Sequence, residues 1–368
     1  MHGKAIQIVS FDNPYPPNYG GVIDVFYKIK ALSDLGVKVY LHAFYDDRTD
    51  VSGLKPYCEN IILYKRNKGM LKHFSILPYM VNTRFSKELI INLEKSDAPI
   101  LFESVRTTSV LRRHIFKQKT AVRCHNIEHN YIFGLCKSER NLFKKLAFYI
   151  EGYKLNHFER IYNKVDYLFP LAFYEQSYFN NIFKAKSTFI PVFQGGTKVE
   201  SLEEFGEYAL FHGDLSISDN IKSALFLVDV FKGINEPLII ASSKQVPLLI
   251  KKIKNHKHIS FQLVSDDNHL NELIKNAQIN VLYSFQQSGT KLKVFNALFK
   301  GRHCILNKNM IDDQAVLDVC HLAENKIEYE NLVKNLFKME FKVTKERREA
   351  LSKYDAKHNA KELIELMC

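Results

Sequence analysis

Short apolar runs and amphipathic helical patterns alternate along the whole chain, and this alternation limits the folds it can adopt. The first cycle reads as a strand at residues 5–9, a proline-rich loop at 10–19 and a helix at 22–35. Gly36 ends this helix, and a second strand follows at 37–44. A strand, a crossover helix and a second strand form a parallel βαβ unit, so the chain is predicted to build α/β sheets.

The alternation stops once, near the middle of the chain, and then starts again. Pro191 and the pair Gly195-Gly196 interrupt the pattern at 190–196, which predicts a hinge between two domains. Strands are predicted at 61–64, 100–102, 120–124, 167–169 and 188–190 before the hinge, and at 208–212, 238–241, 259–263, 279–283 and 304–306 after it. The predicted architecture is two Rossmann-like α/β/α domains at 1–190 and 191–341, followed by a wholly helical tail at 342–368 that could pack back on the N-terminal domain.

Length and composition fit this organisation. A chain of 368 residues with 46% hydrophobic residues is long enough for two separate cores. No apolar run approaches the ~18 residues of a membrane span, and the N-terminus is too short and polar for a signal sequence, so a cytoplasmic protein is expected. The six cysteines have no paired metal spacing, so reduced thiols and no metal site are expected.

The net charge of +12 requires an anionic partner or another explanation. Nucleic acid, anionic lipid and phosphorylated small molecules would all suit it. Because the basic residues are spread along the chain, nucleic-acid binding is the weakest of these hypotheses.

The stretch 277–306 has the pattern of an anion site. It reads as a strand, a polar loop and a helix that begins at Ser288, whose hydroxyl could cap it. Gly289 would leave the helix start open, and Lys293 and Asn296 would lie on the face away from the core. Backbone N–H groups at a helix start, with lysines nearby, can hold a diphosphate. The alternative is a helix whose lysines are simply solvated.

Four landmarks in chain order connect these features to a known family. They are the loop with Gly20-Gly21, the stretch Arg123-Cys124-His125-Asn126-Ile127-Glu128, the glycine turn at 211–216 and the helix at 289–298. With them the chain resembles the GT-B-fold glycosyltransferases, and within these the retaining family 4 group. The resemblance implies two domains that face each other across a cleft, with the C-terminal helix closing the chain.

The resemblance also implies an activity. The chain would transfer a sugar from a nucleotide diphosphate sugar to a glycan or lipid-linked acceptor in cell-surface polysaccharide or glycolipid synthesis, without a metal or other cofactor. His125, Lys291 and Lys293 would be catalytic, the lysines by stabilising the departing diphosphate. The donor would contact Gly20, Gly21, Gly213, Asp214, Ser288, Gly289, Thr290, Lys291, Lys293 and Asn296, and the acceptor Arg123, His125 and Asn126.

The chain departs from the family pattern at two positions. The family has two glutamates eight positions apart, of which the second binds the ribose, and these positions are Ser288 and Asn296 here. An asparagine can still hydrogen-bond to a diol. The departure nevertheless motivates an alternative function, a catalytically impaired scaffold that binds a sugar or nucleotide. Glu151 and Glu159 also have this spacing but lie in the other half, and we interpret that pair as chance.

Two segments of the first half combine basic and aromatic residues. They are the stretch 65–84 and a predicted helix at 141–164. Such a surface suits peripheral binding to an anionic membrane. Lipid-linked acceptors could lie at the inner face of that membrane. The alternative, slightly favoured by the pattern alone, is ordinary core packing with a solvated rim.

Overall fold

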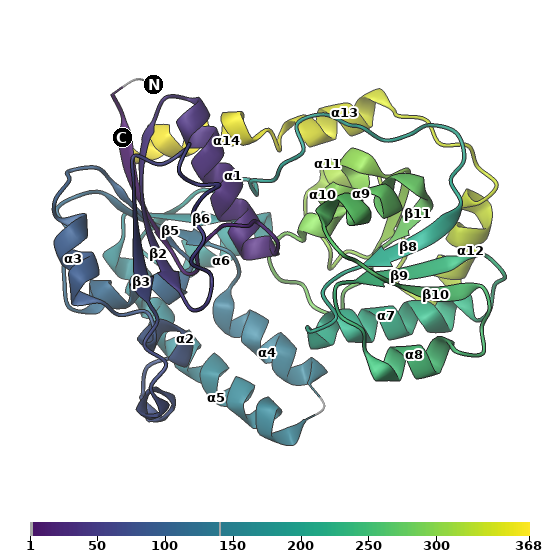
Figure 1. Ribbon diagram of the computed structural model, residues 1–368, viewed down its shortest axis with the longest axis horizontal. Coiled ribbons are helices and arrows are strands. Elements are labelled where there is room, and N and C mark those ends of the chain that lie inside the picture. Colours follow the sequence, from purple (N-terminus) through teal and green to yellow (C-terminus); the bar gives the residue numbers. More distant parts are fainter. Residues whose placement is uncertain (1–2, 140) are drawn as a thin grey trace. The chain divides into compact units, whose positions relative to one another are not determined.

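The computed structural model describes residues 3–139 and 141–368, which form two compact units. Unit 1 holds the described residues up to Cys136, together with Asn141–Gly195 and Tyr354–Cys368. Unit 2 consists mainly of Gly196–Lys353. Figure 1 shows that each unit has its own sheet with helices around it.

Unit 1 is built on a parallel sheet with the strand order β3-β2-β1-β4-β5-β6-β7. Its strands are β1 (Ala5–Ser10), β2 (Lys38–Tyr45), β3 (Asn60–Lys65), β4 (Ile100–Glu103), β5 (Thr120–Cys124), β6 (Tyr167–Pro170) and β7 (Lys186–Ser187). Its helices are α1 (Gly20–Asp34), η1 (Met70–Phe74), α2 (Tyr79–Asn82), α3 (Lys87–Leu93), η2 (Val105–Arg112), α4 (Glu128–Ser138), α5 (Leu142–Phe158), η3 (Glu159–Lys164), α6 (Phe173–Ile182) and α14 (Ala356–Met367), where η marks a 3-10 helix.

Both faces of this sheet are covered, because successive strand residues point to opposite sides. Ile8 packs with α1 and α14 in one buried cluster, whereas its neighbour Val9 packs with the helices of the other face. The apolar runs read from the sequence are therefore strands buried on both sides, as a parallel sheet requires.

Unit 2 repeats this plan with the strand order β10-β9-β8-β11-β12-β13, again parallel. Its strands are β8 (Tyr208–His212), β9 (Leu238–Ser242), β10 (Ile259–Leu263), β11 (Ala277–Val281), β12 (His303–Leu306) and β13 (His321–Leu322). Its helices are α7 (Ser218–Phe231), α8 (Pro247–Ile253), α9 (Asp267–Asn276), α10 (Leu292–Lys300), α11 (Gln314–Leu317), α12 (Lys326–Leu336) and α13 (Lys345–Ser352).

The predicted α/β class and the two Rossmann-like domains are confirmed, whereas one strand is displaced from its predicted position and one was not predicted. The strand predicted at 188–190 lies at Lys186–Ser187, and the short strand β13 was not predicted at all. The tail predicted as helical at 342–368 holds two helices, of which α13 belongs to unit 2 and α14 packs against α1 in unit 1. Isolated two-residue strands carry no hydrophobic period, so their positions depend on the neighbouring strand.

None of the helices in the described part of the chain is both long and apolar enough to cross a lipid bilayer.

Candidate active site

Strand order marks one place in each unit where a ligand site is expected. In unit 1 the strands that follow β1 in the chain lie on both of its sides, with β2 on one and β4 on the other. In unit 2 β8 lies between β9 and β11 in the same way. Ligands of parallel α/β sheets bind outside the carboxyl ends of the strands at such a switch point. The residues that follow these strands are therefore the candidates.

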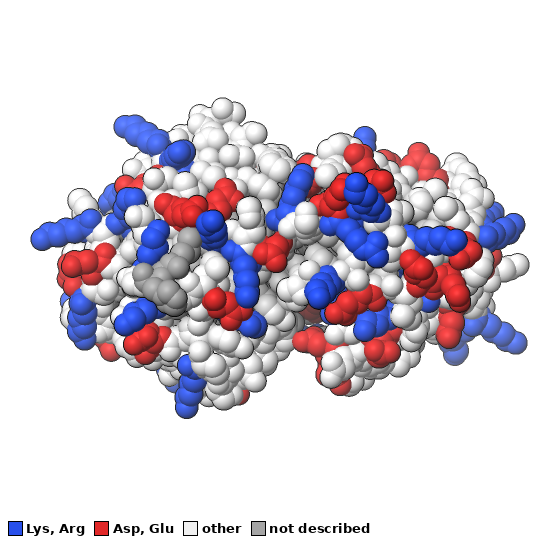
Figure 2. Space-filling model, turned by 90° about the horizontal axis from the view of Figure 1, so that it is seen from above, with Lys and Arg blue, Asp and Glu red and all other residues white. Residues whose placement is uncertain are grey.

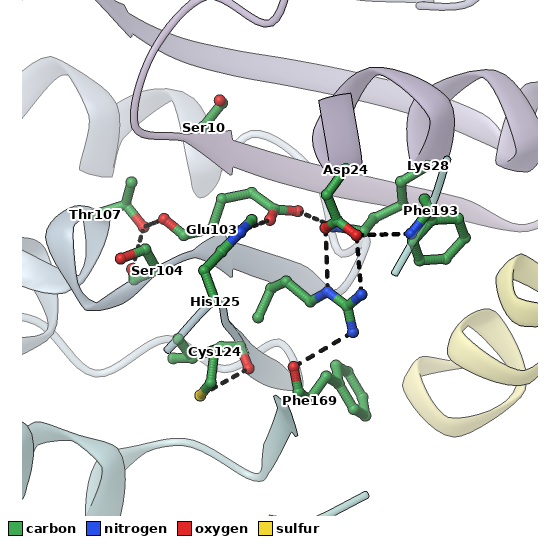
Figure 3. Close-up of polar contacts among 12 residues, drawn as sticks. Ser10, Asp24, Lys28, Glu103, Ser104, Thr107, Cys124, His125, Phe169 and Phe193 are labelled. Carbon is green, nitrogen blue, oxygen red and sulfur yellow. Dashed lines mark hydrogen bonds and ion pairs between the residues drawn. The ribbon is translucent and has the colours of Figure 1, made fainter. Parts of the chain in front are cut away.

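Five charged or titratable side chains meet at this edge of unit 1, and we name them the charged cluster (Figure 3). They are Asp24 and Lys28 on successive turns of α1, Glu103 at the end of β4, Arg123 in β5 and His125 just after it. The Arg123 guanidinium contacts both Asp24 oxygens, at 2.9 and 3.1 Å. Lys28 Nζ lies 2.9 Å from Asp24 Oδ2 and 2.6 Å from Glu103 Oε1.

The charges of this cluster balance one another inside the protein. Asp24, Lys28, Glu103 and Arg123 are at most 1% exposed. Burial alone would raise the pKa of Asp24, but the neighbouring Arg123 and Lys28 outweigh it and lower that pKa. Burial acts on Glu103 in the same direction, and Lys28 followed by His125 lowers the pKa of this carboxyl. Both carboxylates are therefore ionised and already paired with cations.

The same cluster contains a trio of residues of metal-ligand type. Asp24, Glu103 and His125 offer ligand atoms within 4.8 Å of one another. However, Arg123 and Lys28 occupy the carboxylate oxygens that a divalent cation would need. The residues as arranged do not fit a metal ion, and the mechanism considered below uses none.

His125 is the member of the charged cluster that a substrate can reach, since its side chain is 10% exposed. Its Nε2 lies 3.0 Å from Glu103 Oε2, and its ring stands edge-on to Phe11. With the proton on Nε2 donated to Glu103, Nδ1 carries the lone pair that can accept a proton from a hydroxyl. A carboxylate that orients a histidine is a common arrangement for a general base. The adjacent Asn126 is half-buried.

Arg123, predicted to contact the acceptor, has a different role. Its side chain is wholly buried, and besides binding Asp24 it donates to the carbonyls of Ile190 (2.7 Å) and Pro191 (2.9 Å). The guanidinium thus fastens the end of β5 to the segment that follows β7, and it cannot reach a substrate. The prediction for Arg123 is wrong because a long side chain on a buried strand points into the protein.

The glycine pair of the first loop begins helix α1, which starts at Gly20 and not at Val22 as predicted. A Cβ atom on Gly21 would lie 2.6 Å from Cζ of Phe11, far inside contact distance. Gly21 therefore lets the helix start pack against the ring that also contacts His125. The pair Gly20-Gly21 thus supports the position of His125 through packing, separately from the predicted contact with a donor.

A second group of polar residues, which we name the lysine cluster, occupies the switch point of unit 2. Lys293 lies in the first turn of α10, and its Nζ donates to Asn220 Oδ1 (3.1 Å) and lies 5.2 Å from the centre of the Phe211 ring. Asp219 and Asn220 lie in the first turn of α7. The Ser284 hydroxyl, which follows β11, donates to Asp219 Oδ2 (2.9 Å).

This cluster, unlike the one in unit 1, is not internally satisfied. Burial lowers the pKa of Lys293 to about 8, although Asp219 acts in the opposite direction. Burial, and then the charge of Lys293, lowers the pKa of His212 to about 3, so this imidazole is neutral. Asp219 Oδ1 and His212 Nε2 are buried without a hydrogen-bond partner among the described residues. Orphaned buried polar atoms beside a partly exposed lysine indicate a site for a polar, anionic ligand.

Two further residues predicted to bind the donor lie near this cluster. Gly213 follows β8, and a Cβ atom there would come within 3.3 Å of the Asn220 side chain. Asp214 is exposed, and its carboxylate accepts the Ser216 N–H at 2.8 Å, which shapes the turn before α7. The glycine turn thus places the start of α7 beside Lys293.

The predicted helix start at Ser288 is wrong, because α10 begins at Leu292 and Lys291 occupies its N-cap position. Gly289 has a φ of +52°, a left-handed value that cannot continue into a right-handed helix. Ser288, Gly289 and Thr290 therefore form a loop that leads to the helix. Asn296 lies three positions after Lys293 and is half-buried.

Lys291 is likewise placed differently from the prediction. Its Nζ donates to the carbonyls of Ser288 (2.9 Å) and Asn309 (3.1 Å), so the ammonium closes the loop instead of facing a ligand. Of the two lysines predicted to contact a diphosphate, Lys291 therefore contacts backbone carbonyls of its own chain.

A pocket of about 390 Å³ lies at the opposite edge of the unit 1 sheet. Lys119, just before β5, and Tyr167, at the start of β6, line it together with Asp166. The Asp166 carboxylate accepts a hydrogen bond from the Thr120 N–H at 2.8 Å, which fixes the start of β5. We do not place the active site here, because none of the charged-cluster or lysine-cluster residues lines this pocket.

Several residues of the two clusters were not predicted from the sequence. Asp24 and Lys28 are four positions apart just after the glycine pair, a spacing that could have signalled a polar helix face. Glu103 directly ends a short apolar run, where a charged residue lies at the edge of a sheet. Nothing in the sequence pairs Asp219 or Asn220 with Lys293, which is 73 positions from Asn220.

Comparisons with known proteins bear on this geometry. No family model matches the chain. An uncharacterized 44.6 kDa protein in the cps region of Klebsiella pneumoniae is 32% identical over 155 residues, which are 40% of this chain and 39% of that protein. The match thus spans about two fifths of that relative's length.

Solved structures match over nearly the whole chain. Sucrose-phosphate synthase from Thermosynechococcus elongatus has a TM-score of 0.64 at 15% identity, with 99% of this chain and 94% of that chain covered. The lipopolysaccharide outer core galactosyltransferase WaaB has a TM-score of 0.62 at 11% identity, with 98% and 99% covered. Anabaena HepE in complex with UDP and glucose has a TM-score of 0.61 at 13% identity, with 97% and 94% covered.

The chain has the GT-B fold. The prediction of this fold is confirmed by whole-length similarity to these GT-B glycosyltransferases. At such low identity the similarity shows the fold and not the reaction. Membership of the retaining family 4 group is not confirmed, and the function of this GT-B chain has to be argued from its two clusters.

Proposed function

We propose that this GT-B chain is a glycosyltransferase that moves a sugar from a nucleotide diphosphate sugar to a glycan or lipid-linked acceptor. The observation that carries the proposal is the lysine cluster at the switch point of unit 2. A partly exposed, partly desolvated ammonium with orphaned polar atoms beside it suits a ligand that combines negative charge with hydroxyl groups.

The donor would bind through its diphosphate at the lysine cluster. Lys293 would contact a phosphate oxygen, and the backbone N–H groups at the start of α7 would add to the favourable potential. When the bond from the anomeric carbon to the diphosphate breaks, the leaving group gains negative charge, which Lys293 stabilises more strongly than in the ground state. Support comes from HepE, whose structure holds UDP and glucose.

The acceptor would bind at the charged cluster of unit 1. Its attacking hydroxyl would hydrogen-bond to His125 Nδ1, while Glu103 holds the ring through Nε2. The hydroxyl oxygen forms the new glycosidic bond and its proton leaves. In one route the proton goes to His125, which acts as general base. In a retaining front-face route the leaving phosphate takes the proton, and His125 positions the acceptor.

The biological setting is proposed from the comparisons. The relative from Klebsiella pneumoniae lies in a cps region, and WaaB acts in the lipopolysaccharide outer core. We propose a role in cell-surface polysaccharide or glycolipid synthesis, at the inner face of the membrane. A retaining outcome, a hexosyl donor and a metal-independent reaction are parts of the same proposal.

The two alternative functions receive less support. The scaffold without catalysis is not favoured, because the similar structures include a synthase and a galactosyltransferase. Nucleic-acid binding would be served by a concentrated basic surface. On the face shown in Figure 2, lysines and arginines are interspersed with acidic residues.

The test combines binding with turnover. Thermal-shift screening against nucleoside diphosphates and their sugars should identify a donor, because a ligand that binds the folded state raises the melting temperature. Lys293→Ala should weaken donor binding by about ten- to a hundredfold, the value of one charge-assisted hydrogen bond, and lower turnover further. If no nucleotide or nucleotide sugar binds the parent protein, or if Lys293→Ala binds and reacts like the parent, the proposal is wrong.

A further inference from the structure

Unit 1 exposes an unusually apolar surface on α5 and η1. Its large side chains are each between 58% and 89% exposed: Met70, Leu71, Phe74, Ile76, Leu142, Phe143, Leu146, Tyr149 and Tyr153. We name these nine residues the apolar surface. Exposed large apolar side chains in this number mark an interaction site, since they otherwise promote aggregation.

The first turns of α5 bury no side chain, although this half of the helix contacts α4 through Cys136 Sγ, 3.3 Å from the Lys145 carbonyl, and through the Tyr149–Phe133 ring pair. The buried residues of this helix are Gly152, Leu155 and Phe158, all in its second half. The residues from 141 to 147 are exposed on every side of the helix. Core packing, which the sequence pattern slightly favoured for this segment, therefore does not extend to the first turns of α5. Helical turns that bury no side chain gain little stability on their own and are suited to a partner.

Hydrogen bonds hold α5 and the η1 segment together. Lys154 Nζ on α5 donates to the carbonyl of His73 (3.3 Å). The Glu151 carboxylate accepts the N–H groups of Tyr79 (2.9 Å) and Met80 (3.0 Å) at the start of α2. Figure 1 shows α5 beside α2 at one end of unit 1. Hydrogen bonds thus connect the second half of α5 to η1 and α2.

Basic residues border the apolar surface. The stretch 65–84 contains five lysines and arginines and no acidic residue, although Arg66 and Lys68 pair with Asp46 and Arg84 is buried. Helix α5 adds Lys144, Lys145 and Lys154, and its one acid, Glu151, is occupied by the backbone of α2. Exposed apolar side chains with a basic border match a bilayer that has anionic headgroups above an acyl interior.

We propose that the apolar surface inserts into an anionic lipid bilayer and anchors unit 1 to the membrane. The apolar side chains enter the boundary between headgroups and acyl chains, and the lysines bind the lipid phosphates. Attachment of this kind depends on apolar burial and resists salt, whereas purely electrostatic attachment does not. The inference adds a partner to the proposed function, whose lipid-linked acceptor it would bring within reach. It does not depend on the transfer reaction.

The chain contains no tryptophan, so a single introduced one reports its own surroundings. Phe143→Trp places the reporter on the apolar surface, and Ile115→Trp places it at a site on unit 1 that is equally exposed but outside that surface. Both full-length variants would be mixed with vesicles of phosphatidylcholine and phosphatidylglycerol. We expect a blue shift and quenching by brominated lipid for Phe143→Trp, and neither for Ile115→Trp.

Flotation with the same vesicles measures the strength of binding. Because each large side chain contributes roughly tenfold when it is buried, Phe143→Ser with Leu146→Ser should lower partitioning by at least tenfold at both low and high salt. Lys144→Ala with Lys145→Ala should lower it mainly at low salt. UDP titration of each variant should give parent values. If the parent binds vesicles but no nucleoside diphosphate or nucleotide sugar, the proposed function is wrong and this inference still holds.

Two results would overturn the proposal. In the first, Phe143→Trp shows no spectral response and the Phe143→Ser, Leu146→Ser variant floats like the parent. In the second, light scattering shows that the parent self-associates without vesicles and that the serine variant does not. The surface would then be an interface between copies of this chain.

Discussion

The two clusters at the sheet switch points use buried charge in opposite ways. In unit 1, Asp24 and Glu103 are matched by Arg123 and Lys28, and every one of these groups is bonded to another. In unit 2, Lys293 has only an asparagine oxygen within hydrogen-bonding distance, and Asp219 and His212 keep orphaned atoms among the described residues. The first cluster is complete without a ligand, and the second is not.

This difference indicates a division of labour. A closed network fixes its members, so His125 has a defined orientation before any substrate arrives. An open cluster is held at a cost in stability, because the partly desolvated ammonium is hydrogen-bonded to a neutral asparagine and not to a carboxylate. That cost is recovered when an anion binds, which is expected for a site that binds and then releases a charged product.

The largest expected effect comes from breaking the closed network. Asp24→Ala would leave Arg123 and Lys28 buried beside a single carboxylate, and would remove the acceptor for the Phe193 N–H. Loss of one partner of a buried ion pair costs about 3–5 kcal/mol. Urea unfolding followed by circular dichroism should show unit 1 destabilised by this amount.

A matched control lies on the same helix. Asp34 also pairs with a lysine four positions away, Lys30, but both side chains are about one third exposed. Asp34→Ala should change the free energy of unfolding by less than about 1 kcal/mol. If Asp24→Ala and Asp34→Ala change the free energy of unfolding equally, the charges of the unit 1 cluster do not depend on one another for stability.

In unit 2, removal of a buried charge is expected to stabilise the protein instead of destabilising it. The pKa of Lys293, about 8, lies below the ordinary value of about 10.4, so the protonated lysine lowers stability at pH below about 8. The penalty disappears as the pH rises from about 8 to about 10.4. Lys293→Met should therefore stabilise the unliganded protein at neutral pH, by up to about 3 kcal/mol, and by much less near pH 10.

Thermal unfolding at both pH values checks this prediction. Lys300 serves as the control, since it lies on the same helix and its Nζ also donates to an asparagine oxygen, that of Asn271. Its pKa is lowered less strongly, so Lys300→Met should change stability little. A Lys293→Met variant that is less stable than the parent at neutral pH would contradict the claim that charged Lys293 destabilises the unliganded protein.

The sequence predicted the fold more completely than the clusters. Each long strand could be read from an apolar run, because parallel strands are buried on both faces and keep the whole run apolar. The order of these runs led to the two Rossmann-like domains. The prediction failed where a position depends on distant partners, as for β13, which has two residues and exists only beside β12.

The dependence on distant partners also explains which site residues could be predicted from the sequence. His125, Gly213 and Lys293 lie at strand ends or helix starts, which local patterns mark. The direction of a side chain is not local, so Arg123 and Lys291 were assigned to substrates although both bind backbone carbonyls. Asp24 and Glu103 are 79 positions apart and meet only through the sheet and Lys28.

The most direct test of the account asks whether a diphosphate completes the lysine cluster. Near pH 8 about half of the Lys293 side chains are protonated, and a bound diphosphate would raise the pKa of this lysine. Titration calorimetry of UDP in buffers with different ionisation enthalpies should therefore show uptake of up to about half a proton per site. Lys293→Met should bind UDP at least about tenfold more weakly and without this uptake. The same affinity and the same uptake in parent and variant would contradict the central claim.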